Sequence, residues 1–239
     1  LENLETLEHY ERSIELYRRL FRIEPRLVAY DLHPEYLATK YAHARYDAAS
    51  GVSLVAVQHH HAHVASCLVD NGRTGPAVGV AFDGTGYGSD GHIWGGELLV
   101  ADLAGYRRAG RLGEFPLPGG AAAIRRPFRT ALGLLMAAGL DPSAFPALAA
   151  LDAQEVTVVT QQVVRGLNAP LTTSAGRLFD AVAALLGVCG DTTYEAQAAM
   201  ELEAVAAAGE GPPYPLELRQ EGQTWVIDWR PMLVALLAD

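Results

Sequence analysis

The sequence predicts an α/β protein whose binding residues lie at the carboxyl ends of strands. Short apolar runs alternate with segments of helical periodicity along the first part of the chain. Four of the eight histidines stand within residues 59–63, directly after one such run, and a glycine-rich stretch at 83–88 follows another. Because sites in sheets of this class collect where strands end, both stretches are candidates for binding chemistry.

The first part of the chain predicts two strand–helix units. Leu4 and Phe21 bound a stretch of apolar residues at helical spacing, and Pro25 ends it. We expect, in order, a helix over 4–21, a strand over 27–30 that delivers Asp31, a helix from Pro34 to about 48, a strand over 53–57, and a helix that opens with the histidines.

The pattern changes after Pro76. An apolar run at 78–82 enters the glycine-rich stretch, and residues 94–100 resume as a strand, which together predict a hairpin with a glycine-rich turn. Further on we expect a helix from about 122 to 138, a looser segment over 142–154, helices over 177–186 and about 195–208, a loop over 209–215 and a strand over 224–227.

Composition excludes several classes of protein. The net charge of -10 and sequence pI near 5.2 would repel a phosphate backbone, which argues against nucleic acid as a partner. Cys67 and Cys189 are far apart and form no metal-binding or disulfide motif, which favours a reducing cytoplasm. The richest apolar run, 131–138, is far shorter than the roughly 20 residues of a membrane span, so no membrane partner is expected.

The histidine run contains a metal-binding pattern. His59 and His63 are four residues apart, so on a helix their imidazoles share one face, and neutral imidazole is a common metal ligand. The alternative is a set of histidines that caps a helix and faces water. His60 and His61 point off the shared face, which suggests outer-sphere or surface positions. His60 also stands where a zincin protease has its glutamate, which argues against peptide hydrolysis.

The glycine-rich stretch suggests a phosphate loop. Gly84 and Gly86 allow backbone N–H groups to approach phosphate closely, Thr85 adds a hydroxyl, and Asp83 can hold a metal or order water. The alternative is purely conformational, because Asp-Gly sequences join many hairpins.

Five motifs in order resemble one family. They are "DLHPEYLATKYA", "VQHHHAHVASCL", "VGVAFDGTGYGSDGHIWGGELL", "FPLPGGAAAIRRPFRTAL" and "TSAGRLFDAVAALLGVCGDTTYEAQAAMELE". In sequence and spacing they resemble the C-terminal carbamoyl-transfer domain of the HypF family, the maturation carbamoyltransferases of nickel–iron hydrogenases. The resemblance implies a two-lobed actin/hexokinase-like ATPase (ribonuclease H-like) fold, incomplete at both ends, with the remainder of the first lobe at 1–76 and part of the second lobe at 77–239.

The resemblance also implies the site. In relatives a histidine pair and aspartates bind a divalent metal that contacts a nucleotide-linked carbamoyl group. His59 and His63 are then the metal pair and Asp83 the third ligand, with iron or zinc the expected metal. Gly84, Thr85 and Gly86 would contact phosphate. Gly176 and Asp180, in "GRLFDA", would contact the nucleotide, although the same segment also suits a helix start capped by Ser174.

Two positions depart from the family pattern. Ala121 stands where an acidic residue is expected, and Ala196 stands where glycine is usual, so the roles of both loops are open. Upstream domains of the family, which form carbamoyl adenylate from carbamoyl phosphate and ATP, have no motif in this chain.

The implied reaction moves the carbamoyl group from carbamoyl adenylate to the C-terminal cysteine of a HypE-like protein, which contributes cyanide ligands to the hydrogenase. No catalytic nucleophile from this chain is expected, because the partner brings the sulfur. Two alternatives remain: an O-carbamoyltransferase of the natural-product type, and a non-catalytic nucleotide-binding module.

Overall fold

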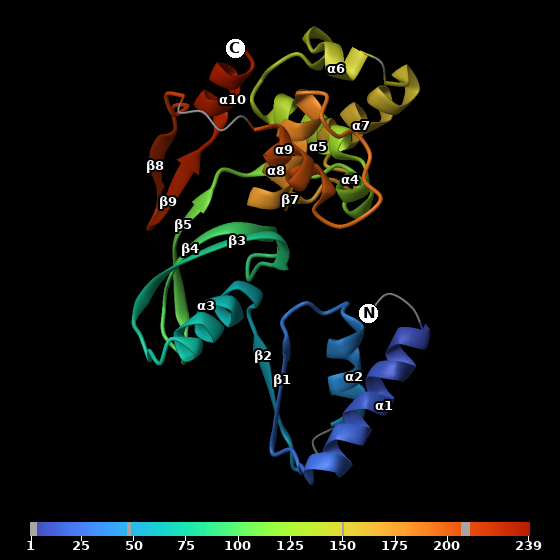
Figure 1. The fold of residues 1–239 in the computed structure, drawn as a ribbon, viewed down its shortest axis with the longest axis vertical. Coiled ribbons are helices and arrows are strands. Elements are labelled where there is room, and N and C mark those ends of the chain that lie inside the picture. The colour runs from blue at the N-terminus through green and yellow to red at the C-terminus, as the bar shows by residue number, and fades with distance from the viewer. Residues whose placement is uncertain (1–3, 47–48, 150, 207–210) are drawn as a thin grey trace. The chain divides into compact units, whose positions relative to one another are not determined.

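The computed structural model describes residues 4–46, 49–149, 151–206 and 211–239 (Figure 1). By their internal contacts the residues form two units, Leu1–Ala62 and His63–Asp239. The division falls inside one continuous helix, α3 (His59–Asp70). The lobe boundary expected after residue 76 stays a prediction.

The first unit is a pair of parallel strands with helices. Its elements are α1 (Leu4–Phe21), β1 (Leu27–Asp31), α2 (Leu37–Arg45) and β2 (Ser53–Val57). The strands pair in register, with Asp31 opposite Val57 at their carboxyl ends. Tyr10 and Tyr41 meet edge to face, with ring centroids 5.5 Å apart, and thereby join α1 to α2.

The second helix begins later than its proline predicted. The Asp31 carboxylate accepts a hydrogen bond from the His33 N–H, and the His33 ring accepts one from the Glu35 N–H. These local contacts hold the chain in turns through Pro34 and delay α2 until Leu37. The predicted end of this helix, near residue 48, lies outside the described residues.

The second unit is built on one mixed sheet. Among the described residues its strands are β3 (Ala77–Tyr87), β4 (Ile93–Ala101), β5 (Tyr106–Leu112), β6 (Phe115–Pro116), β7 (Leu171–Thr172), β8 (Glu217–Glu221) and β9 (Thr224–Asp228). They run in the order β6-β7-β4-β5-β9-β8, and β3 pairs with β4 as an antiparallel hairpin. Through β4 the hairpin therefore connects directly to β7 on one side and to β5 on the other.

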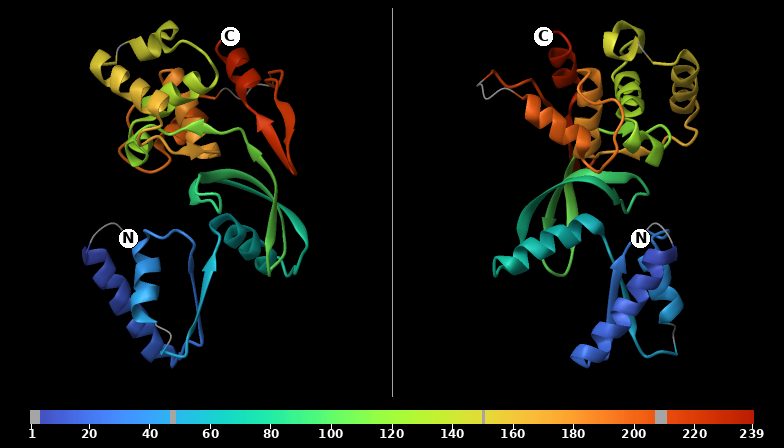
Figure 2. Two further views of the ribbon diagram at one scale, coloured as in Figure 1. Left: turned by 180° about the vertical axis from the view of Figure 1, so that it is seen from behind. Right: turned by 45° about the vertical axis from the view of Figure 1, so that its right-hand side comes forward.

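Helices pack on two regions of this unit (Figures 1 and 2). They are α3, α4 (Ala121–Arg125), α5 (Pro127–Ala137), a short 3-10 turn (Pro142–Ala144), α6 (Pro146–Ala149), α7 (Ala153–Arg165), α8 (Ala175–Leu185), α9 (Gln197–Val205) and α10 (Arg230–Leu236). Val64 and Leu68 of α3 pack on Trp94 and Leu99 of β4. Helices α5 and α8 form the centre of the larger core, together with Trp229.

The α/β class is confirmed, and three local expectations change. Residues 83–87 belong to strand β3 and are not a turn. The helix expected over 122–138 is two helices separated at Arg126, because the following Pro127 disfavours helical geometry in the residue before it. The sequence did not predict helices α7 and α10 or strands β5, β6, β7 and β8. The ends expected at 208 and 209 lie outside the described residues.

Within the described ranges, no helix combines the length and the apolar character that crossing a lipid bilayer requires.

Helix α5 packs closely against the backbone of β6 through Gly133. A Cβ atom at this position would collide with the carbonyl oxygen of Pro116. We predict that Gly133→Ala lowers the free energy of unfolding by about 1 to 3 kcal/mol, because overpacking against backbone exceeds the gain of about 1 kcal/mol in helix propensity. Urea unfolding measures the change. Gly105→Ala, with open space around the added atom, is the matched control. Equal stability of both variants would contradict the packing contact.

Candidate functional site

Helix α3 begins directly after β2 and carries the clustered histidines. Gln58 Oε1 accepts a hydrogen bond from the His61 N–H at 2.9 Å, which satisfies a backbone donor in the first turn. His59 and His63 are one turn apart, so both side chains project from the same side of the helix. His60 is completely buried, with Nδ1 3.2 Å from Gln58 Nε2, so it is not a surface residue.

Asp83 of β3 completes a group of three potential ligands. His63 Nε2 lies 3.5 Å from Asp83 Oδ2. One ligand atom from each of His59, His63 and Asp83 lies within 4.8 Å of the other two. Two imidazoles and one carboxylate gathered this closely are a donor set suited to a divalent metal. Binding of a metal stays a prediction.

His59 also contacts a carboxylate, which sequence reasoning did not assign to it. His59 Nδ1 lies 2.8 Å from Asp31 Oδ2. The parallel pairing of β1 and β2 accounts for the proximity of these two residues, since Asp31 ends β1 and His59 comes two residues after the end of β2. The signal in the sequence was that one of two neighbouring parallel strands ends in Asp31 and the other is followed directly by polar residues.

The Asp83 backbone is held by the start of α8. The Ser174 hydroxyl donates to two backbone carbonyl oxygens, that of Asp83 at 2.7 Å and that of Gly84 at 2.8 Å. The same hydroxyl accepts a hydrogen bond from the Arg177 N–H and so caps α8. A Cβ on Gly176 would lie 2.9 Å from the Gly84 Cα. The helix therefore meets the backbone of the strand at Gly176, which explains the need for glycine at that position.

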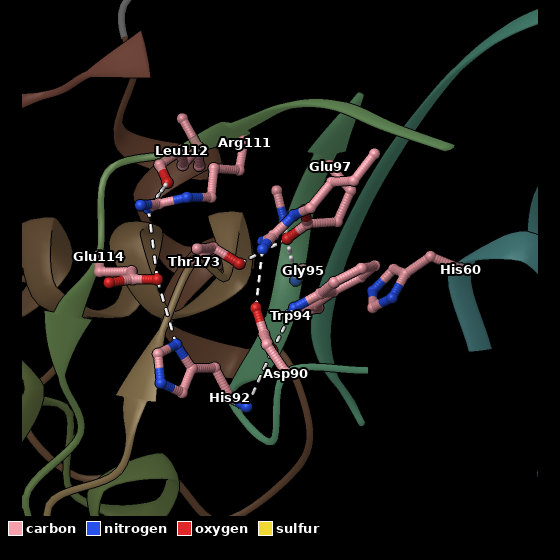
Figure 3. A network of polar contacts seen from close by, with 12 residues as sticks. His60, Asp90, His92, Trp94, Gly95, Glu97, Arg111, Leu112, Glu114 and Thr173 are labelled. Carbon is pink, nitrogen blue, oxygen red and sulfur yellow. Dashed lines mark hydrogen bonds and ion pairs between the residues drawn. The ribbon is translucent and has the colours of Figure 1, made fainter. Parts of the chain in front are cut away.

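A buried carboxylate supports this junction (Figure 3). Glu97 of β4 is completely buried, and its Oε1 accepts a 2.5 Å hydrogen bond from the Thr173 hydroxyl, beside Ser174. Its Oε2 accepts a 2.7 Å hydrogen bond from Arg108 Nε. The Arg108 guanidinium lies over the Trp94 ring, 3.9 Å from the centroid. Because the carboxylate is paired on both oxygens, it links β4 and β5 to the segment that holds Asp83.

The predicted phosphate residues lie in an irregular part of β3. The pairing with β4 shifts register between Phe82 and Gly86, so Asp83, Gly84 and Thr85 form a bulged segment. The Asp83 carboxylate accepts a 2.6 Å hydrogen bond from the Gly84 N–H. Contact between their backbones places Gly84 beside Gly176, whereas the ligand contacts of both residues stay predictions.

Asp180 lies on α8 in a buried pair. Its carboxylate is 3.0 Å from the Arg177 guanidinium, and the two residues are 2% and 6% exposed. Burial raises the pKa of Asp180 to about 6, against the opposing effect of the Arg177 charge. A buried acidic group beside the Gly84–Gly176 contact is thus neutral over a wider pH range than an exposed aspartate.

The raised pKa predicts a pH dependence of stability. The fold favours the neutral Asp180 carboxyl, so its contribution to the free energy of unfolding is fully present below about pH 3.8 and is lost as pH rises through about 6. Relative to Asp180→Asn, wild-type stability should fall by roughly 2 to 3 kcal/mol across this window. Urea unfolding and carbon-13 titration of the Asp180 carboxyl measure both effects. A titration midpoint near 3.8 would contradict the assignment.

Family models match both parts of the chain. Residues 1–70 match the HypF Kae1-like domain, and residues 79–239 match the second subdomain of the carbamoyltransferase Kae1-like domain. The chain is 44% identical over 216 residues to carbamoyltransferase HypF2 of Cupriavidus necator and 48% identical over 198 residues to carbamoyltransferase HypF of Rhodobacter capsulatus. These alignments cover 89% and 80% of this chain and 26% of each relative.

Solved structures give the same result for the fold. A crystal structure of full-length HypF in its phosphate- and nucleotide-bound form has a TM-score of 0.88 and 41% identity, covering 99% of this chain and 36% of that one. HypF of T. kodakarensis has a TM-score of 0.81 and 31% identity, covering 99% and 32%. The mixed sheet, the histidine helix and the junction of β3 with α8 thus belong to a Kae1-like domain. Within that class, the chain belongs to the HypF carbamoyltransferase family.

Proposed function

We propose that the polypeptide containing this chain transfers a carbamoyl group from carbamoyl adenylate to the C-terminal cysteine of a HypE-like protein, in the maturation of nickel–iron hydrogenases. The chain spans about a quarter of the length of the two curated relatives, 26% of each, so the complete reaction is a proposal for the whole protein. Carbamoyl phosphate and ATP would enter through domains outside this chain. The names of the relatives support the carbamoyl group as the cargo.

The group of His59, His63 and Asp83 is the single observation that carries the proposal. These residues would hold a divalent metal, with iron or zinc expected, through two imidazoles and one carboxylate. Three protein ligands leave coordination positions open, and a bound metal would supply Lewis acidity toward the carbamoyl oxygen and the phosphate. Affinity order alone does not choose between the metals.

The bulged segment beside Asp83 would bind the phosphate of the substrate. Gly84 and Gly86 lack side chains that would keep phosphate away from the backbone, and Thr85 supplies a hydroxyl. Gly176 abuts Gly84, so a nucleoside contact at the start of α8 belongs to the same region. A contact from Asp180 has less support, because its carboxylate is buried against Arg177.

The proposed transfer needs no nucleophile from this chain. The partner thiol loses its proton to solvent, and the resulting thiolate attacks the carbamoyl carbon. A sulfur–carbon bond forms, the bond from that carbon to the phosphate oxygen breaks, and its electron pair leaves with AMP. The role of this chain is to orient carbamoyl adenylate and to stabilise the negative charge that develops on the leaving phosphate oxygen.

Replacement of either histidine tests the metal assignment. In the full-length protein, His59→Ala and His63→Ala should each weaken metal binding by at least about 100-fold, the upper end of the loss seen when an outer-sphere partner of a ligand is removed. Metal content by elemental analysis and zinc affinity by calorimetry measure this. His9→Ala, on α1, removes a histidine outside the group and should bind like the wild type. A variant that binds as much metal as the wild type, with the same affinity, would sink the assignment.

Acceptor choice tests the reaction. Full-length protein supplied with carbamoyl phosphate and ATP should add one carbamoyl group to a peptide ending in cysteine, detected by mass spectrometry, and His63→Ala should abolish this while leaving formation of carbamoyl adenylate intact. Labelling of a sugar hydroxyl in place of the thiol would favour an O-carbamoyltransferase. Nucleotide binding without transfer to either acceptor would favour a non-catalytic module.

A further inference from the structure

The contact between Asp31 and His59 joins the end of β1 to the start of α3. Asp31 Oδ2 lies 2.8 Å from His59 Nδ1, at the distance of a charge-assisted hydrogen bond. The side chains are 22% and 28% exposed, so the contact is mostly shielded from water. An interaction of this length and burial fixes the orientation of the imidazole ring.

Asp31 is itself held by contacts that do not involve His59. Its other carboxylate oxygen, Oδ1, accepts a 2.8 Å hydrogen bond from the His33 N–H. Its carbonyl oxygen accepts a 2.9 Å hydrogen bond from the Thr39 hydroxyl. Both contacts lie within the first unit, as does His59. The carboxylate is therefore placed before any ligand binds, and the histidine ring must adapt to it.

An ionised carboxylate can only accept a hydrogen bond, so His59 must carry its proton on Nδ1. A ring nitrogen that bears a proton has no lone pair for a metal. Coordination by His59 consequently goes through Nε2, and the negative carboxylate makes that nitrogen a stronger donor.

We propose that Asp31 is a positioning residue, which fixes the Nδ1-protonated tautomer of His59 and so prepares its Nε2 for the metal. This inference rests on the proposed metal site and adds to it a role for the "DLHPEY" segment. Asp31 does not touch the metal; it acts through the ring of His59.

Asp31→Asn separates this role from simple loss of a charge. The amide oxygen of asparagine should keep the hydrogen bond from the His33 N–H, which turns the amide NH2 toward His59 Nδ1. That nitrogen must then accept, so the ring proton moves to Nε2 and occupies the metal-binding position. The expected result is zinc binding 10- to 100-fold weaker than in the wild type.

The matched control is Glu35→Gln, which removes one carboxylate from the same segment. Glu35 is exposed and pairs with Lys40, so this variant should bind zinc like the wild type. Zinc affinity is measured by calorimetry on the full-length protein. Nitrogen-15 shifts of labelled histidine, recorded without metal at a pH where the ring is neutral, give the tautomer directly. A merely structural role of Asp31 would lower the melting temperature without moving the ring proton.

Each outcome decides one question. Wild-type protein in which the group of His59, His63 and Asp83 binds neither zinc nor iron overturns the proposed metal site, and with it this inference. Wild-type protein that binds zinc while Asp31→Asn binds it equally well overturns the positioning role alone. Should Asp31→Asn fail to fold, the wild-type spectrum still decides, because a His59 ring protonated on Nε2 is incompatible with the inference.

Discussion

The site depends on the close approach of α8 to strand β3 at Asp83 and Gly84. Ser174 donates to the carbonyl oxygens of both strand residues, and the Cα atom of Gly84 lies 2.9 Å from where a Cβ atom on Gly176 would stand. Because the contact is between backbones, neither element can shift without losing hydrogen bonds that water would have to replace. The position of a potential metal ligand is thus set by a helix from a distant part of the sequence.

The two kinds of potential ligand are positioned by different contacts. The histidines take their direction from helix geometry and from the carboxylate of Asp31, which the parallel pairing of β1 and β2 brings to the same strand ends. Asp83 instead takes its position from the bulge in β3 and from the buried Glu97, which ties the hairpin to Thr173. Loss of the Asp31 contact would leave the contacts of Glu97 in place, and the reverse also holds. One part of the site can therefore change its geometry while the fold is kept.

Local sequence patterns were enough to predict the elements whose structure depends on side-chain periodicity alone. The strand at 53–57 and the one-turn spacing of His59 and His63 follow directly from side-chain periodicity. Residues 83–87 were expected to turn, because glycines and an Asp-Gly pair favour turns locally; pairing with β4 and contact with α8 keep them in a strand. Helix α7 was missed although its amphipathic pattern is clear, since the proline-rich segment before it suggested a loop. Contacts between segments far apart in the sequence decided the conformation of residues 83–87, whereas the signal for α7 was present in the local sequence.

The contact between Ser174 and Asp83 also bears on the order in which parts of the chain fold during synthesis. It joins residues 91 positions apart, so a ribosome completes the histidine helix and β3 well before the start of α8 is made. Domains form from the N-terminus during synthesis, and contacts of long sequence separation form last. A nascent chain therefore holds all three candidate ligands while the clamp on one of them is still missing. Any metal bound at that stage would lack the support that Ser174 gives to the Asp83 backbone.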